Sequence, residues 1–171
     1  MALSPAQITT AAGVLGVVTT TMFASTSLTI SSLTESALLL RPQDGQSLPE
    51  SRHLARQWKV FEAFAHNVSM SALVIGTASL IYAGLKSSTS MTLRRKLFFT
   101  SAAFNLLTIP YTLMFMLRKN GELEQRSQTG KKRNLNHIDT YALMQDVSKL
   151  GTVRGSLPLL SAIVGALALV I

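Results

Sequence analysis

Four long stretches of the chain are apolar and free of Asp, Glu, Lys and Arg, and their spacing limits what the chain can fold into. These uncharged runs cover residues 8–34, 63–85, 97–117 and 155–171. A helix rises about 1.5 Å per residue, so about 20 apolar residues cross the roughly 30 Å hydrocarbon core of a bilayer. We therefore predict an all-α integral membrane four-helix bundle that forms one domain over residues 1–171. The expected spans are about 8–34, 61–85, 97–117 and 152–171.

The composition agrees with a membrane protein. Hydrophobic residues make up 47% of the chain and charged residues only 14%, against about 25% in ordinary soluble domains. All charged side chains fall between the uncharged runs, so the net charge of +8 belongs to the loops. Basic loops face anionic lipid and set topology, so we expect the lipid bilayer as a partner and no nucleic acid.

Two features narrow the chemistry and the processing. The chain has no cysteine, which removes disulfides, thiolate metal ligands and cysteine nucleophiles from consideration. The first run lacks a basic segment before it and is much longer than the apolar core of a signal peptide, which covers about 7–15 residues. We therefore expect it to be a retained first helix.

The distribution of basic residues predicts the topology. Lys and Arg number four in the first connection, four in the second and eight in the third. Four crossings place the first and third connections on one side, and the positive-inside rule assigns that side to the cytoplasm. We expect the third connection to be an exposed turn from Arg118 to about Asp139, after which a helix starting at Asp139 or Thr140 feeds into the last span.

Small and hydroxyl-bearing residues mark the faces that we expect to pack. The first run is rich in Ser and Thr, a composition that favours contact with other helices. Glycines in the first two runs favour close backbone approach; they are Gly13, Gly16, Gly76 and Gly84. In the third run, Asn105 is expected to form an interhelical hydrogen bond.

The predicted topology brings polar residues from distant parts of the sequence to one level of the bilayer. Trp58, Glu62 and His66 follow at intervals of four on one face of the second helix, so Glu62 can orient the imidazole of His66. His66 and Asn67 lie inside an uncharged run, where ionisable groups usually face the bundle interior. A catalytic histidine and a structural one both remain open, and Trp58 alone also fits an interfacial anchor.

The third and fourth helices add further polar groups at this level. Pro110 frees a carbonyl and is expected to kink its helix, so that Tyr111 or Thr112 lines a cavity. Arg154 opens the last span, where it either extends to the lipid headgroups or turns inward and binds an anion.

These positions resemble a family of short four-span membrane proteins that includes fungal anthrone oxygenases. The resemblance covers most of the chain and rests on Gln57-Trp58, on Pro110-Tyr111-Thr112 with Met116, Asn120 and Leu123 after it, and on Val153-Arg154-Gly155. It implies a membrane-embedded enzyme of secondary metabolism, with no metal and no organic cofactor.

The chain departs from the family at two positions. Members often carry a Trp seven residues and an Asn or His three residues before the Arg of the fourth helix, whereas this chain has Val147 and Gly151. If those side chains serve oxygenation, this chain catalyses a neighbouring reaction such as cyclisation or isomerisation of a polyketide-like intermediate.

The residues are compatible with cofactor-independent oxygenation of a lipophilic, polyketide-derived polycyclic substrate. An anthrone is a weak carbon acid, and a base that titrates near neutrality starts the reaction. The expected catalytic residues are His66, Glu62 and Arg154. The expected substrate contacts are Trp58, Asn67, Tyr111, Asn120, Phe64 and Phe115.

Other functions and the cellular setting stay open at this point. The competing class is a non-catalytic membrane adaptor, in which the same polar residues hold helices or a partner together. We expect the protein in the endoplasmic reticulum or another endomembrane, and homo-oligomerisation remains open.

Overall fold

The computed structural model describes residues 4–33, 51–88, 91–128 and 137–171, and every regular element in them is helical. The predicted turn residues 41–50 and the basic run 131–133 lie outside the described residues. The elements are α1 Pro5–Leu33, α2 Ser51–Lys86, α3 Thr92–Tyr111, the π-helical turn η2 Thr112–Met116, α4 Leu117–Gln128 and α5 His137–Val170.

Four of the helical segments are long and apolar enough to cross a membrane. They are Pro5–Leu33, Arg56–Lys86, Thr92–Gln125 and Ala142–Val170. Many of their large hydrophobic side chains are exposed, such as Val74 and Leu107, as expected where hydrocarbon surrounds the bundle. The predicted fold class, an all-α four-helix membrane bundle, is confirmed.

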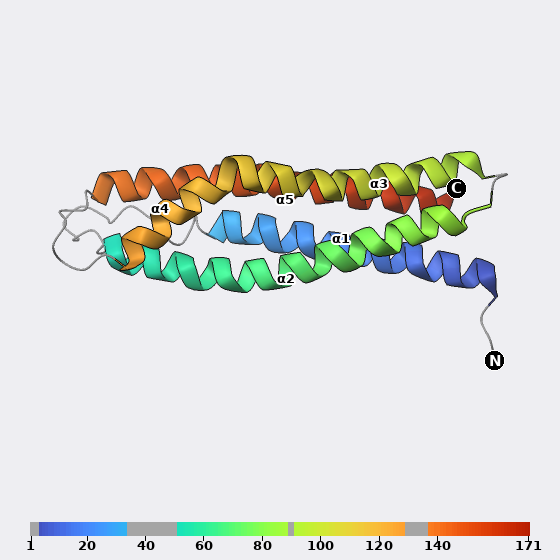
Figure 1. Ribbon diagram of the computed structural model, residues 1–171, viewed down its shortest axis with the longest axis horizontal. Coiled ribbons are helices and arrows are strands. Elements are labelled where there is room, and N and C mark those ends of the chain that lie inside the picture. The colour runs from blue at the N-terminus through green and yellow to red at the C-terminus, as the bar shows by residue number, and fades with distance from the viewer. Residues whose placement is uncertain (1–3, 34–50, 89–90, 129–136) are drawn as a thin grey trace.

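The long helices pack side by side around one axis (Figure 1). α1 contacts α2 and α5, and α3 contacts the same two helices from the other side. Both termini lie at one end of the bundle together with the turn between α2 and α3, as four crossings require. α2 and α5 extend past the end of α1 at the opposite end, where α4 crosses the bundle.

The half of the bundle near the termini is held by small residues and short hydrogen bonds. A Cβ at Gly16 would lie 2.7 Å from the Leu80 side chain, and one at Gly76 would lie 2.9 Å from the hydroxyl of Thr20. The Asn105 amide donates to the Thr20 hydroxyl at 2.9 Å, so the expected interhelical hydrogen bond is present. Of the four glycines, Gly16 and Gly76 show the expected close approach of another backbone, whereas Gly13 and Gly84 meet side chains of Leu169, Phe98 and Phe99.

The third connection differs from the prediction of an exposed turn. The chain stays helical from Leu117 to Gln128, because this segment has a tertiary partner that the polar sequence does not reveal. Leu123 is fully buried, while Lys59 pairs with Glu124 at 2.8 Å on the α2 side. The turn prediction was therefore wrong for this segment. The helix expected to feed the last span is confirmed, since α5 runs unbroken into it.

Pro110 produces the expected irregularity in the third span as a π-helical turn. Proline has no backbone N–H, so the ladder loses a bond there, and the five residues after Tyr111 form η2. A π-turn shifts the helical register, which turns Met116 into the core and leaves Leu113 exposed. The site below depends on this shift.

Candidate functional site

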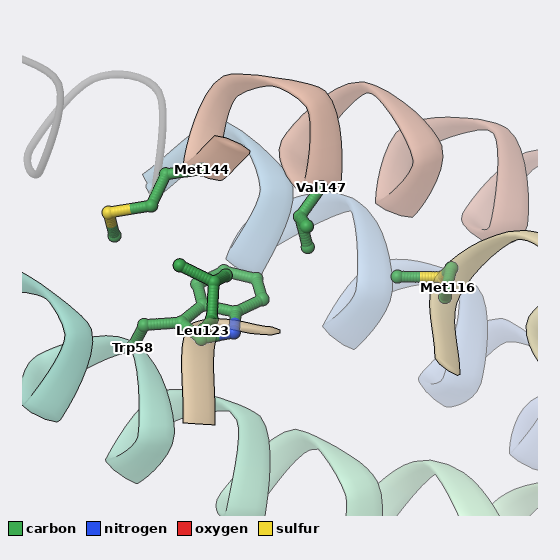
Figure 2. Close-up of a cluster of buried hydrophobic side chains, with 5 residues drawn as sticks. All are labelled: Trp58, Met116, Leu123, Met144 and Val147. Carbon is green, nitrogen blue, oxygen red and sulfur yellow. The ribbon is translucent and has the colours of Figure 1, made fainter. Parts of the chain in front are cut away.

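The candidate site lies at the α4 end of the bundle, around the buried side chain of Trp58. An apolar cluster forms there from α2, η2, α4 and α5; its buried members are Trp58, Met116, Leu123, Met144 and Val147. Figure 2 shows Trp58 rising from α2, with Leu123 close to its ring and with Met144 and Val147 reaching in from α5. Residues that are far apart in the sequence thus pack together in one cluster.

A polar cluster adjoins the apolar one. The Asn120 amide of α4 donates a short hydrogen bond to the Glu62 carboxylate of α2. The Arg154 guanidinium of α5 reaches the Ser27 hydroxyl of α1 at 3.5 Å and lies within electrostatic range of both Glu62 and Tyr111. The Tyr111 hydroxyl donates to the Leu150 carbonyl at 3.3 Å. Four long helices and α4 therefore contribute to one cluster around Arg154.

Several buried polar atoms of the cluster have no hydrogen-bond partner among the residues that the structure describes. They are the indole N–H of Trp58, the Nε of Arg154 and the amide oxygen of Asn120. The first two are donors and the third is an acceptor. A buried donor without a partner costs about 1–3 kcal/mol, so such atoms need a physical explanation. A ligand that carries a carbonyl or enolate oxygen and a hydroxyl would satisfy them.

The two positions where the chain departs from the resembled family lie beside this cluster. Val147 is fully buried against Trp58, and Gly151 is buried where an added Cβ would collide with the Ser31 hydroxyl. Ser31 is itself held in place, because its carbonyl accepts a hydrogen bond from Ser148 at 2.8 Å. This chain therefore fills the two positions with helix packing instead of polar side chains.

Three of the expected substrate contacts lie outside the cluster. The side chains of Asn67 and Phe64 are exposed, because both residues lie on the side of α2 opposite to Glu62. Phe115 is also exposed, although its ring lies 5.1 Å from that of Tyr111. The interior placement expected for Asn67 was wrong, and the substrate contacts expected of all three residues stay predictions. Trp58, Tyr111 and Asn120 do lie in the cluster, and their roles stay predictions.

His66 is not enclosed by the helices as expected. Its side chain is exposed, although it lies within electrostatic range of Glu62 one turn earlier on α2. Lys86 lies 20 residues further along α2, or about 30 Å along a helix, so His66 falls near the far boundary of the hydrocarbon core. An exposed imidazole costs little free energy at that depth, because the polar headgroup region is close. Of the polar residues expected to meet at this end of the bundle, Glu62 and Arg154 do meet, and His66 lies at the edge of their cluster.

Some residues of the cluster were not anticipated from the sequence. Ser27 and Ser31 were part of the hydroxyl-rich first run, but that pattern did not indicate which hydroxyls would meet Arg154 or α5. Met144 belongs to a helical stripe whose partner was unknown. Nothing in the sequence pattern distinguished Ser148 from other serines.

Metal ligands do not gather in the part of the chain that the structure describes. No group of three or more His, Cys, Asp or Glu side chains lies close enough together there to hold a metal ion. The candidate site thus consists of one arginine, one carboxylate and neutral donors and acceptors.

The comparisons with known proteins place these residues in a family. The family model described as anthrone oxygenase matches residues 58–164, more than half of the chain. The matched segment runs from Trp58 past Arg154 and so spans α2, α3, α4 and most of α5. No curated protein and no solved structure gives a significant match to the chain. The chain belongs to the anthrone oxygenase family.

Proposed function

We propose that the protein is a membrane-embedded enzyme of secondary metabolism that oxygenates a lipophilic, polyketide-derived polycyclic substrate at an activated CH₂ group. The observation that carries this proposal is the buried cluster of Arg154 and Glu62, with unpaired hydrogen-bonding atoms on Arg154, Trp58 and Asn120, inside the segment matched by the family. A bundle that only needed to pack would gain stability by replacing such groups with apolar ones.

The proposed reaction needs no group beyond the substrate, oxygen and the side chains. A base removes one proton from the CH₂ group, and the resulting carbanion transfers an electron to O₂. The radical pair combines into a carbon peroxide anion, which takes back the proton that the base removed. The resulting hydroperoxide then loses its remaining C–H hydrogen as a proton together with hydroxide, which leave as one water, and a ketone remains. One oxygen atom of O₂ enters the product, the other leaves as water, and the four electrons come from the CH₂ carbon.

The side chains have distinct tasks in this proposal. His66 accepts the first proton, and the Glu62 carboxylate stabilises the imidazolium from one turn away on α2. Arg154 and the Trp58 N–H stabilise the enolate oxygen, and one such donor contributes about 3 kcal/mol in a dry site. The Asn120 oxygen accepts a hydrogen bond from a substrate hydroxyl. The protein works in the endoplasmic reticulum or another endomembrane, where lipophilic intermediates concentrate.

The test is turnover of an anthrone by the purified protein in lipid nanodiscs. Oxygen uptake and quinone absorbance should rise together, and ¹⁸O₂ should deliver one labelled atom to the product. His66→Gln and Arg154→Met should lower turnover while the folded yield stays the same. Arg118→Met is the matched control, because the Arg118 side chain is 90% exposed. Lost assembly of the two site variants, with no turnover by the parent protein, would support the adaptor function instead.

A second candidate reaction is favoured by Val147 and Gly151. These residues stand where members of the resembled family often carry a Trp and an Asn or His, so the chain lacks two side chains that could act on oxygen. Cyclisation or isomerisation needs the same proton transfers but no oxygen. Conversion of a polyketide-like substrate under argon would support this reaction, whereas a strict need for O₂ would refute it.

A further inference from the structure

One side of α2 changes from buried to exposed along its length. Gly84, Thr77 and Leu73 lie on this side and are buried, and a Cβ at Gly84 would lie 3.3 Å from the Phe99 ring of α3. His66 lies seven residues before Leu73, which places it on the same side of the helix. It is nevertheless exposed, as is Met70 beside it. α3 covers this side at Gly84 and Leu73 belongs to a buried cluster with Phe23 of α1, but at the level of His66 this side of α2 is uncovered.

The side of α3 that faces α2 also changes from buried to exposed, here with increasing residue number. Phe98 and Ala102 are buried against α2, but Ile109, seven residues after Ala102, is exposed, and so is Leu113 in η2. Figure 1 shows why: α2 and α3 separate from the turn that joins them, and α4 then crosses back to α2. These exposed side chains lie where α2 and α3 diverge, and we call this exposed region between the two helices the α2–α3 opening.

Two ion pairs join α4 to its neighbours at the end of the bundle beside this opening. α4 is joined to α2 through Lys59 and Glu124 at 2.8 Å, and to α5 through Lys119 and Asp146 at 2.6 Å. Leu123 fills the space below it and is fully buried. Within the described residues, a route into the cluster from the aqueous end would have to pass these contacts.

The depth of the α2–α3 opening suits a substrate that arrives through lipid. Met70 lies 16 residues from Lys86, or about 24 Å along α2, and Leu113 lies 17 residues from Lys96, or about 26 Å along the third span. Both positions fall just inside the edge of a hydrocarbon core about 30 Å thick. Glu62 and Ser69, on the next turns of α2, are less exposed than His66 and lead inward from it.

We propose that the α2–α3 opening is the entrance through which a flat lipophilic substrate passes from the bilayer to the cluster around Arg154 and Glu62. This inference rests on the proposed function, because it assigns the route of that substrate. Polycyclic phenols collect where apolar rings reach the acyl chains and hydroxyls reach the headgroups, which is the depth of the opening. His66 would then be the first polar group that the substrate meets.

The chain supplies its own reporter and a clean background for the test. Trp58 is the single tryptophan and there is no cysteine. Single-cysteine variants Met70→Cys and Leu113→Cys, labelled with a bulky maleimide, would obstruct the opening. Ile75→Cys and Leu107→Cys are matched controls at exposed positions of the same two helices, because Ile75 lies nine residues from His66, or about 180° around α2, and Leu107 lies two residues from Ile109, or about 200° around α3. Anthraquinone added to phosphatidylcholine proteoliposomes is the probe, and stopped-flow quenching of Trp58 fluorescence measures its arrival.

The inference predicts that a bulky label at either border position slows quenching about tenfold, while a label at either control position leaves the rate within about twofold of the unlabelled protein. Equal rates for all four labelled variants would overturn the entrance, as would an absence of quenching in the unlabelled protein. Quenching that is slowed only by the border labels, together with no turnover of any anthrone, would keep the entrance and refute the proposed function.

Discussion

The two halves of the bundle treat their buried polar groups differently. Near the termini, the Ser101 and Ser161 hydroxyls lie 3.0 Å apart, and each donates to the carbonyl of the other residue at 2.7 Å. Near α4, the Arg154 Nε, the Trp58 N–H and the Asn120 oxygen find no partner in the described part of the chain. The Ser101–Ser161 pair satisfies its own hydroxyls, although the Thr77 hydroxyl and the Arg94 Nε of this half also lack a partner among the described residues, whereas the unpaired atoms of the α4 half belong to one cluster.

This difference separates a region selected for packing from one suited to binding. Buried groups that are paired contribute to stability, whereas unpaired ones reduce it and persist where a ligand pairs with them. The cluster around Arg154 also contains a carboxylate and a guanidinium, whereas Ser101 and Ser161 are uncharged. The following variants change one half at a time.

Arg154→Leu is expected to have the largest effect, and on turnover instead of stability. Loss of the guanidinium removes a donor to the developing enolate, which costs about 3 kcal/mol or a rate factor of about 100. Arg154→Lys should recover part of the rate, because a charge remains without the planar fork. Steady-state quinone formation measures both, and an unchanged kcat/KM for Arg154→Leu would place the binding function elsewhere.

Gly16→Val should produce the largest loss of stability in the packed half. Its side chain would meet the Leu80 Cγ at 2.7 Å and the Leu80 backbone N at 3.2 Å, so the helices must separate. Overpacking of this kind costs about 1–3 kcal/mol. Denaturant titration in detergent, followed by the helical circular dichroism signal, measures it.

Gly121→Ala is the control for that prediction, because a Cβ there meets nothing within 4 Å. It should stabilise α4 by up to about 1 kcal/mol through helix propensity alone. If Gly16→Val were as stable as Gly121→Ala, the close packing of α1 against α2 would not limit stability.

The features predicted from sequence are those that a single helix reveals by itself. Uncharged runs long enough to span a bilayer gave the fold, and glycines within them gave close contacts such as Gly16 with Leu80. Pro110 gave an irregular turn because its missing N–H is a local property. The polar groups Glu62, Arg154 and Asn120 were also expected at one level, because four crossings fix which helix ends meet.

The features that were missed depend on how neighbouring helices are placed. The segment after Leu117 is polar and contains Gly121, so nothing local distinguishes α4 from a turn until Leu123 meets Trp58. His66 has the spacing of an inward residue, but its side of α2 is exposed at that depth. Rotation and divergence of helices are set by tertiary contacts, which one sequence does not encode in a local pattern.

Ser101→Ala should destabilise the packed half by about 1 kcal/mol. The Ser101 hydroxyl donates to the Ser161 carbonyl and lies 3.0 Å from the Ser161 hydroxyl, so the variant removes that donor, while the Ser161 hydroxyl keeps the Ser101 carbonyl as its acceptor. A double-mutant cycle with Ser161→Ala isolates the pair, and the double variant should be less unstable than the sum of the two single variants. Strict additivity would show that the two hydroxyls do not stabilise each other.

Ser69→Ala makes the same chemical change on α2 toward the α4 half, and it is expected to have the smallest effect. Ser69 is buried like Ser101, but its hydroxyl has no hydrogen-bond partner among the described residues. Removing an unpaired hydroxyl relieves its desolvation cost, so the free energy of unfolding should stay within about 0.5 kcal/mol of the parent protein or rise. Denaturant titration beside Ser101→Ala compares the two serines directly. A loss of about 1 kcal/mol for both variants would mean that the Ser69 hydroxyl is paired in the membrane, and the contrast between the two halves would then fail on α2.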